Sequence, residues 1–145
     1  MTVHLIKLCV GIETPEHLER VQAARISDIA ARTGRRVAWH VTRRTPRRAA
    51  ELLDGGSLYW VMRGQIWARQ TITGVQAVAD DSGRRACRID LDPTIVRVIA
   101  RPRKAFQGWR YLEPANAPPD QAGRPDDSPE MPDWMVAELS ELGLL

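Results

Sequence analysis

The chain contains 145 residues, of which 43% are hydrophobic, and this suffices for one domain with an ordinary core. Its longest apolar run is far shorter than the ~18 residues that a membrane-spanning helix requires. The first residues also lack the basic and apolar segments of a secretory signal peptide. We therefore expect a soluble, cytoplasmic protein and exclude the integral membrane class.

The formal net charge of +3 hides an uneven distribution of charge along the chain. Residues 1–112 carry twenty Lys and Arg against ten Asp and Glu, whereas residues 113–145 carry one Arg against eight Asp and Glu. A basic segment of this kind indicates an anionic partner. The alternative is that the acidic tail folds back on the basic body and neutralises it.

The first elements in the chain are predicted to be a strand and a helix. Residues 3–10 are mostly apolar, which is typical of a central strand. Thr14 and Pro15 then supply a capping hydroxyl and a proline at the first helical position. Apolar residues recur at helical spacing as far as Gly34, so we expect a helix over about 15–33 that ends at this glycine.

A second strand and a short second helix are expected next. Residues 36–43 alternate as a strand does, with Trp39 on one face and His40 on the other. Thr45-Pro46 repeats the pattern of a capping hydroxyl followed by proline, and it predicts a helix through residues 47–53.

The middle of the chain is rich in β-branched and aromatic residues that are interrupted by turn residues. It predicts strands over residues 57–63, 66–78, 84–91 and 94–100. Gly74 is a candidate β-bulge inside the longest of these runs. Short strands joined by hairpins and flanked by two helices predict an α+β fold with a small, mostly antiparallel, barrel-like sheet.

The last part of the chain differs in composition. Residues 113–133 contain six prolines with Asp, Gly, Ala and Ser between them, which predicts a linker. An amphipathic helix is expected after it. We therefore divide the chain into a basic domain (1–112), an acidic linker (113–133) and a tethered C-terminal helix (134–144). That helix is expected to dock either on its own domain or on a protein partner.

Two runs of cations are candidates for contacts with nucleic acid. The first lies between Asp28 and Glu51, where the chain has seven arginines and no acid. Four of them surround the expected start of the second helix, namely Arg43, Arg44, Arg47 and Arg48. The free N–H groups and the dipole of a helix start favour a phosphate. The alternative is a solvated basic face without a ligand.

The second run lies between Asp92 and Glu113, where cations are mixed with aromatic residues. Its candidate contacts to a phosphate backbone are Arg101, Arg103, Lys104 and Arg110. Phe106, Trp109 and Tyr111 lie among them and could stack on the bases of a single strand. The alternative is that these aromatic residues anchor an irregular segment on the sheet.

The sequence lacks motifs of catalysis and metal binding. It has no nucleophile elbow and no zinc-protease motif, and its three histidines are not at metal-ligand spacing. We therefore predict no cofactor and no metal. Cys9 and Cys87 lie in strand-like stretches and are expected to be reduced and buried. A candidate pocket for a base or a nucleotide is formed by Trp39, His40, Trp60, Trp67, Arg69 and Gln70.

Several segments of the chain resemble an alphaproteobacterial family of domains of unknown function. These segments are residues 2–11, 51–61, 69–70, 101–103 and 105–112. The resemblance covers about residues 1–112, and it implies no activity, substrate or catalytic residue.

A looser similarity is to the PUA-like superfamily, which includes the ASCH and EVE domains. It lies in Asp54-Gly55-Gly56 after the short helix, in the strand-rich middle and in residues 108–112. This similarity implies a small barrel with flanking helices that binds RNA or modified bases. The G-x-K-x-x-E-x-R signature of ASCH domains is absent from the chain.

These observations predict a non-catalytic module that binds RNA or another nucleic acid and makes no membrane contact. The acidic tail is expected to compete with the nucleic acid for the basic surface. Two alternatives are a protein-interaction module that acts through the C-terminal helix, and an enzyme acting on a nucleotide with His40 or an Asp as general base.

Overall fold

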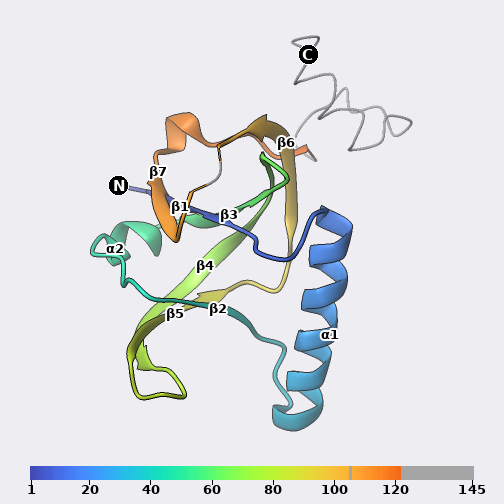
Figure 1. Cartoon of the computed structure of the whole chain (residues 1–145), viewed down its shortest axis with the longest axis vertical. Coiled ribbons are helices and arrows are strands. Elements are labelled where there is room, and N and C mark those ends of the chain that lie inside the picture. Colours follow the sequence, from blue (N-terminus) through green and yellow to red (C-terminus); the bar gives the residue numbers. More distant parts are fainter. Residues whose placement is uncertain (105, 122–145) are drawn as a thin grey trace.

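The computed structural model describes residues 1–104 and 106–121, and the description below concerns these residues. They form seven strands and two α-helices (Figure 1). In chain order the elements are β1 (His4–Leu8), α1 (Pro15–Thr33), β2 (Ala38–Thr42), α2 (Ala49–Leu52), β3 (Ser57–Met62), β4 (Gln65–Ala79), β5 (Arg85–Leu91), β6 (Val96–Pro102) and β7 (Trp109–Leu112). The α+β class is therefore confirmed, while the expected C-terminal helix lies outside the described residues.

The strands form one mostly antiparallel sheet in the order β2-β5-β4-β3-β1-β7, with β6 added beside the first half of β4. The pairing of β1 with β3 is parallel, because α1 and β2 separate these two strands in the chain. Within the described residues β2 and β7 stand at the two ends of this order without pairing. The sheet is therefore open at one seam.

The long strand β4 joins the two halves of the sheet. Its first half pairs with β3 and β6, and its second half pairs with β5. The register of β4 against β5 shifts at Gly74, which confirms the expected bulge. A Cβ atom at Gly74 would lie 2.6 Å from the Oδ2 atom of Asp90, so a larger residue here would displace this carboxylate.

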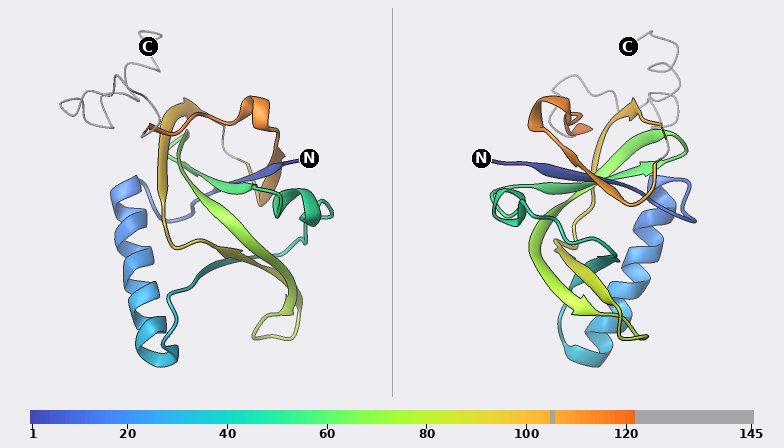
Figure 2. Two further views of the ribbon diagram at one scale, coloured as in Figure 1. Left: turned by 180° about the vertical axis from the view of Figure 1, so that it is seen from behind. Right: turned by 60° about the vertical axis from the view of Figure 1, so that its left-hand side comes forward.

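The helix α1 begins and ends where the sequence predicts. The side chain of Thr14 accepts a hydrogen bond from the backbone N–H of His17, and Pro15 occupies the first turn. Gly34 follows the helix with φ of 75°, a left-handed conformation that glycine adopts without strain. Figures 1 and 2 show α1 along one side of the strands and α2 on the other.

Two expectations about local structure need correction. The expected second helix is present but has only four residues, Ala49–Leu52, and it does not begin at Thr45-Pro46. The segment 109–112, for which one alternative was an irregular segment anchored by its aromatic residues, is instead a strand that pairs with β1. The two segments also contact each other, because the hydroxyl of Tyr111 in β7 accepts hydrogen bonds from the backbone N–H groups of Arg47 and Arg48. These long-range contacts hold the chain extended before α2.

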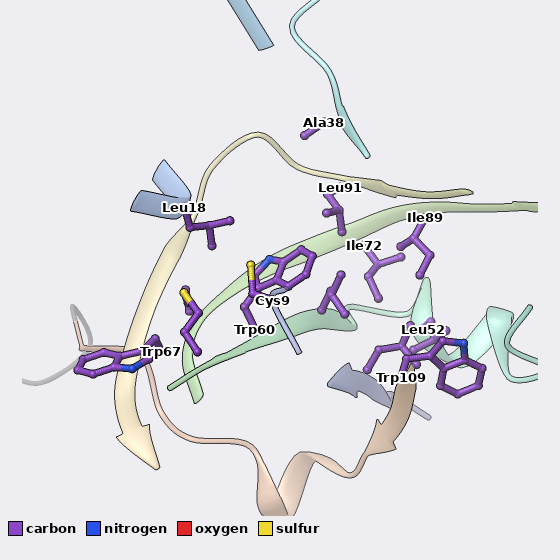
Figure 3. Packing of buried hydrophobic residues seen from close by; sticks show 14 of the residues in the cluster. Cys9, Leu18, Ala38, Leu52, Trp60, Trp67, Ile72, Ile89, Leu91 and Trp109 are labelled. Carbon is purple, nitrogen blue, oxygen red and sulfur yellow. The ribbon is translucent and has the colours of Figure 1, made fainter. Parts of the chain in front are cut away.

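The buried side chains form two clusters, one on each face of the central strands. In β3, Trp60 and its alternate neighbours belong to the larger cluster, whereas Tyr59 and Val61 belong to the smaller one. Helix α1 covers the larger cluster with Leu18 and Ile26. Figure 3 shows Trp60 in the middle of this cluster, with Trp109 and Trp67 toward opposite ends.

The chain continues past β7 along the body of the protein. The backbone N–H of Ile99 in β6 donates to the carbonyl of Pro119, and the side chain of Gln121 donates to the carbonyl of Val98. The guanidinium of Arg69 makes two hydrogen bonds of 2.8 and 2.7 Å to the carboxylate of Asp120. Residues 119–121 therefore contact β4 and β6, and the rest of the expected linker after them lies outside the described residues.

No helix in the described part of the chain is long and apolar enough to cross a membrane.

Candidate functional site

The arginines of the first basic run differ in their partners. Arg43 forms an ion pair with Asp80, and Arg48 forms ion pairs with Glu51 and Glu113. These carboxylates neutralise two of the four expected phosphate contacts. The expected helix start is also unavailable, because the N–H groups at this point already donate to Tyr111.

Arg44 connects the end of β2 to β7 across the open seam of the sheet. Its guanidinium lies 4.2 Å from the centroid of the Trp109 ring, and its Nη2 atom donates to the carbonyl oxygen of Trp109 over 3.1 Å. The indole N–H of Trp109 donates in return to the carbonyl of Arg44 over 2.8 Å. Trp109 is buried, so its ring anchors the segment, as one of the two alternatives predicted.

The second basic run meets the first at this same tryptophan. The Nη1 atom of Arg110 donates to the carbonyl oxygen of Trp109 over 3.1 Å, the oxygen that also accepts from Arg44. The guanidinium groups of Arg110 and Arg103 both lie over the ring of Phe106, at 5.7 and 5.4 Å from its centroid. Two arginines from distant parts of the chain therefore converge on one carbonyl oxygen.

The remaining candidate cations of the second basic run are Arg101 and Lys104, and both are exposed. Arg101 donates to the carbonyl of Asn116 over 2.8 Å. Arg101 and Arg103 line a hollow of about 310 Å³ together with Tyr111 and Glu113. No carboxylate pairs with Arg101, Arg103, Lys104 or Arg110 within the described residues, so their charges face solvent.

Three of the expected pocket residues come together between α1 and the sheet. Trp39, His40 and Trp60 line a cavity of about 130 Å³, which we name the α1–β2 pocket. The rings of His40 and Trp60 meet edge to face, with centroids 5.2 Å apart. A second hollow of about 270 Å³ adjoins this pocket, since both are lined by Trp39 and by Gln22 and Arg25 of α1.

Gln70 lies directly behind the pocket in a buried hydrogen-bond network. Its Oε1 atom accepts from the indole N–H of Trp60 over 3.0 Å and from Gln22 over 2.7 Å. Its Nε2 atom donates to Gln22 and to the carbonyl of Asp92. This network satisfies a fully buried amide and holds the indole of Trp60 in one orientation.

The other two expected pocket residues lie elsewhere. Trp67 is buried in the larger cluster, at the end opposite Trp109 (Figure 3). Arg69 lines a separate hollow of about 360 Å³, where it is paired with Asp120. Neither side chain lines the α1–β2 pocket.

Lys7, Cys9 and Arg25, which no motif had singled out, also line the α1–β2 pocket. The alternation of side chains along β1 could have revealed Lys7, because it lies on the same face as Leu5 and Cys9, which both belong to the core. Gln22 shows a similar signal, since it occupies the core-facing row of α1 between Leu18 and Ile26.

The pKa values of three pocket residues, Lys7, Cys9 and His40, are shifted toward the neutral form of each side chain. Burial, with the nearby charges of Lys7 and Arg25, lowers the pKa of His40 to about 4, so its imidazole is neutral at pH 7. Burial also lowers the pKa of Lys7 and raises the pKa of the Cys9 thiol to about 11. A thiol with so high a pKa is a poor nucleophile. In the described part of the chain, no group of three His, Cys, Asp or Glu could hold a metal ion.

Comparison with known proteins shows that the chain matches a protein family. No curated protein and no solved structure matches it. The family match begins at residue 5 and runs to residue 145, so it includes the acidic tail as well as the segments that resemble a domain of unknown function. Because the match spans nearly the whole sequence, the chain belongs to the family described as "Protein of unknown function (DUF1489)".

Proposed function

We propose that the protein binds RNA or another nucleic acid through a basic surface around β7. We define this basic surface as Arg44, Arg47, Arg101, Arg103, Lys104 and Arg110. Arg43 and Arg48 are left out of it because each is already paired with a carboxylate. Such a polyanion is abundant in the cytoplasm, the compartment that the sequence predicts.

One observation carries this proposal. The guanidinium groups of Arg44 and Arg110 converge on the carbonyl oxygen of Trp109, which brings one arginine of each basic run together. Neighbouring positive charges repel one another unless an anion lies between them, and arginine forks match the geometry of phosphate. The ring of Phe106, partly exposed beneath Arg103, offers an aromatic edge beside the cations.

A catalytic role receives less support from the same structure. The enzyme alternative requires a titratable group with a displaced pKa in a pocket, and His40 is such a group. Its pKa of about 4 makes it a weak base at neutral pH, however, and in the described residues no carboxylate orients it. We therefore retain a binding module as the proposed function.

The test is the binding of a fluorescent single-stranded RNA of twenty nucleotides, measured by anisotropy over a series of salt concentrations. Six contacts to phosphate predict that log K falls with log[salt] with a slope of about −4. The variant Arg103→Gln/Lys104→Gln leaves the contacts at Trp109 intact and should reduce that slope in magnitude by about 1.4. Arg44→Gln/Arg110→Gln should do the same if it remains folded.

The control removes the same charge elsewhere. Arg35→Gln/Arg36→Gln changes two exposed arginines in the segment between α1 and β2. Figure 1 shows the end of α1, where this segment begins, far from β7. This variant should bind RNA with the wild-type slope. An equal loss in the control and in Arg103→Gln/Lys104→Gln would show that only net charge matters, and it would refute the basic surface as the binding site.

The acidic tail gives the proposal a second test. We propose that it competes with RNA for the basic surface. The six carboxylates after residue 121 are Asp126, Asp127, Glu130, Asp133, Glu138 and Glu141. Replacing all six by their amides in the full-length chain should tighten RNA binding at low salt, because the competing charges are gone. Unchanged or weaker binding would refute the competition.

A further inference from the structure

The α1–β2 pocket combines aromatic walls with cations, and none of the described residues gives it a carboxylate. Trp39 and Trp60 line it, and Lys7 and Arg25 approach it from β1 and α1. No acidic residue is among its lining residues. The nearest acid in the adjoining hollow is Asp28, and this carboxylate is paired with Arg32 at 2.9 Å.

Lys7 occupies a place that favours an apolar side chain. It follows Val3 and Leu5 on the core-facing side of β1, and both of those residues are fully buried. Placing an ammonium there costs solvation, and no carboxylate in the described residues offsets that cost. A half-buried cation of this kind in a cavity indicates a ligand that supplies the missing negative charge.

His40, which lines the pocket, also has an unsatisfied polar atom. Its buried Nε2 atom makes no hydrogen bond to any of the described residues. A neutral imidazole nitrogen can donate or accept, so it can meet a hydroxyl or a ring nitrogen. Buried polar atoms without partners are uncommon in folded proteins, and a bound ligand is one way to supply the missing partner.

The size of the pocket limits what can enter it. A cavity of about 150 Å³ holds a benzene-sized ring, and the α1–β2 pocket has about 130 Å³ with a larger hollow adjoining it. The pocket alone is slightly smaller than that, so a planar ring fits only if part of the ligand extends into the adjoining hollow along α1. Trp39 and Trp60 contribute indole rings to the lining of the pocket. The guanidinium of Arg88 lies over one face of Trp39, 4.1 Å from the ring centroid, and Gln70 holds Trp60 through its indole N–H.

We propose that the α1–β2 pocket binds a small aromatic or heteroaromatic carboxylate, with its ring against Trp39 and Trp60 and its carboxylate at Lys7 and Arg25. The ligand neutralises Lys7 in place of a protein carboxylate. None of these residues belongs to the basic surface around β7. The proposal therefore stands independently of RNA binding, and each can fail without the other.

The experiment uses the full-length protein with benzoate and nicotinate as probes. Calorimetry should show binding with a dissociation constant between about 1 µM and 1 mM, as expected for so few atoms. Benzamide lacks the charge and cyclohexanecarboxylate lacks the planar ring, so both should bind at least about tenfold more weakly. The chain has two lysines, Lys7 and Lys104, and in NMR spectra only the side-chain signal of Lys7 should shift with benzoate.

Two matched variants separate this site from the basic surface. Lys7→Met removes the ammonium but keeps an unbranched chain, and it should abolish benzoate binding while raising the melting temperature. Lys104→Met should leave benzoate binding unchanged and weaken RNA binding. Trp39→Leu, at a partly exposed position that tolerates change, should weaken benzoate binding without altering RNA binding.

The outcomes that overturn the proposal are specific. Equal affinities for benzoate and benzamide would show that the negative charge of the ligand does not contribute to binding. Wild-type benzoate affinity in Lys7→Met, or a Lys104 signal that shifts with benzoate, would place the carboxylate elsewhere. In another outcome, adenosine monophosphate shifts the Lys7 signal while benzoate and nicotinate do not bind. That result would identify the pocket as a nucleotide site and refute the carboxylate assignment.

Discussion

Acid should destabilise this protein between pH 7 and pH 5, chiefly through His40. Burial in the α1–β2 pocket lowers the pKa of His40 from 6.5 to about 4, with further contributions from the charges of Lys7 and Arg25. The unfolded chain takes up a proton on His40 below about pH 6.5. The folded protein resists that proton until about pH 4. Stability is therefore lost as the pH falls through this window, because protons favour the unfolded state.

The size of the effect follows from the two pKa values. With 6.5 in the unfolded state and about 4 in the folded state, lowering the pH from 7 to 5 removes about 2 kcal/mol from the free energy of unfolding. His4 acts in the same direction, since burial lowers its pKa and its Nδ1 atom accepts a hydrogen bond from the N–H of Ser57 over 3.0 Å. Aspartates and glutamates titrate mostly below this window.

Urea unfolding at pH 7 and pH 5, followed by tryptophan fluorescence, measures this loss for the wild type and for His40→Gln. The variant should lose about 2 kcal/mol less than the wild type between the two pH values. Each protein serves as its own reference, so a change in packing at residue 40 does not enter the comparison. Equal losses in both proteins would refute the reasoning, because they would mean that the folded protein protonates His40 near pH 6.5.

Two further substitutions test how the fold is held together, with the free energy of unfolding measured in urea. Gly56→Ala should cost about 3 kcal/mol or more, because its Cβ would lie 2.3 Å from the carbonyl oxygen of Val3 and 2.4 Å from that of Leu52, both backbone atoms. Gly83→Ala, at φ of 81° with open space around it, should cost only about 1 kcal/mol, and equal costs would contradict the close approach at Gly56. Tyr111→Phe should cost about 1 kcal/mol, because two backbone N–H groups lose their acceptor, and an unchanged stability would show that water replaces the hydroxyl fully.

Local signals predicted the elements that local interactions stabilise. Helix α1 could be bounded from Thr14, Pro15 and Gly34, since its caps lie within three residues of its ends. The hairpin strands β3, β4 and β5 were found because apolar runs alternate with turn residues, and the bulge at Gly74 was visible as a glycine inside a strand. Pairings between neighbouring strands require little sequence separation, so the pattern of the chain suffices to predict them.

Strand β7 could not be predicted in the same way. Its four residues pair with β1, so that Trp109 lies opposite Lys7, about a hundred residues earlier in the chain. The faces of β2 also depend on tertiary contacts, because Trp39 and Val41 are exposed while the smaller Ala38 and Thr42 are buried. Alternation along a strand identifies two faces, but the space beneath each face decides which of them is buried.

For the candidate site, the sequence by itself determined the charge asymmetry, the two basic runs and three of the residues that line the pocket, because composition and local order are properties of the chain. Only the tertiary structure decided which cations stay unpaired. Arg43 is neutralised by Asp80 across thirty-seven positions, whereas Arg44 and Arg110 meet at one carbonyl oxygen. The tertiary structure also placed Lys7 of β1 in one pocket with Arg25 of α1 and Trp39 of β2. The charges that a fold leaves without partners depend on contacts between distant segments, and a linear pattern does not contain those distances.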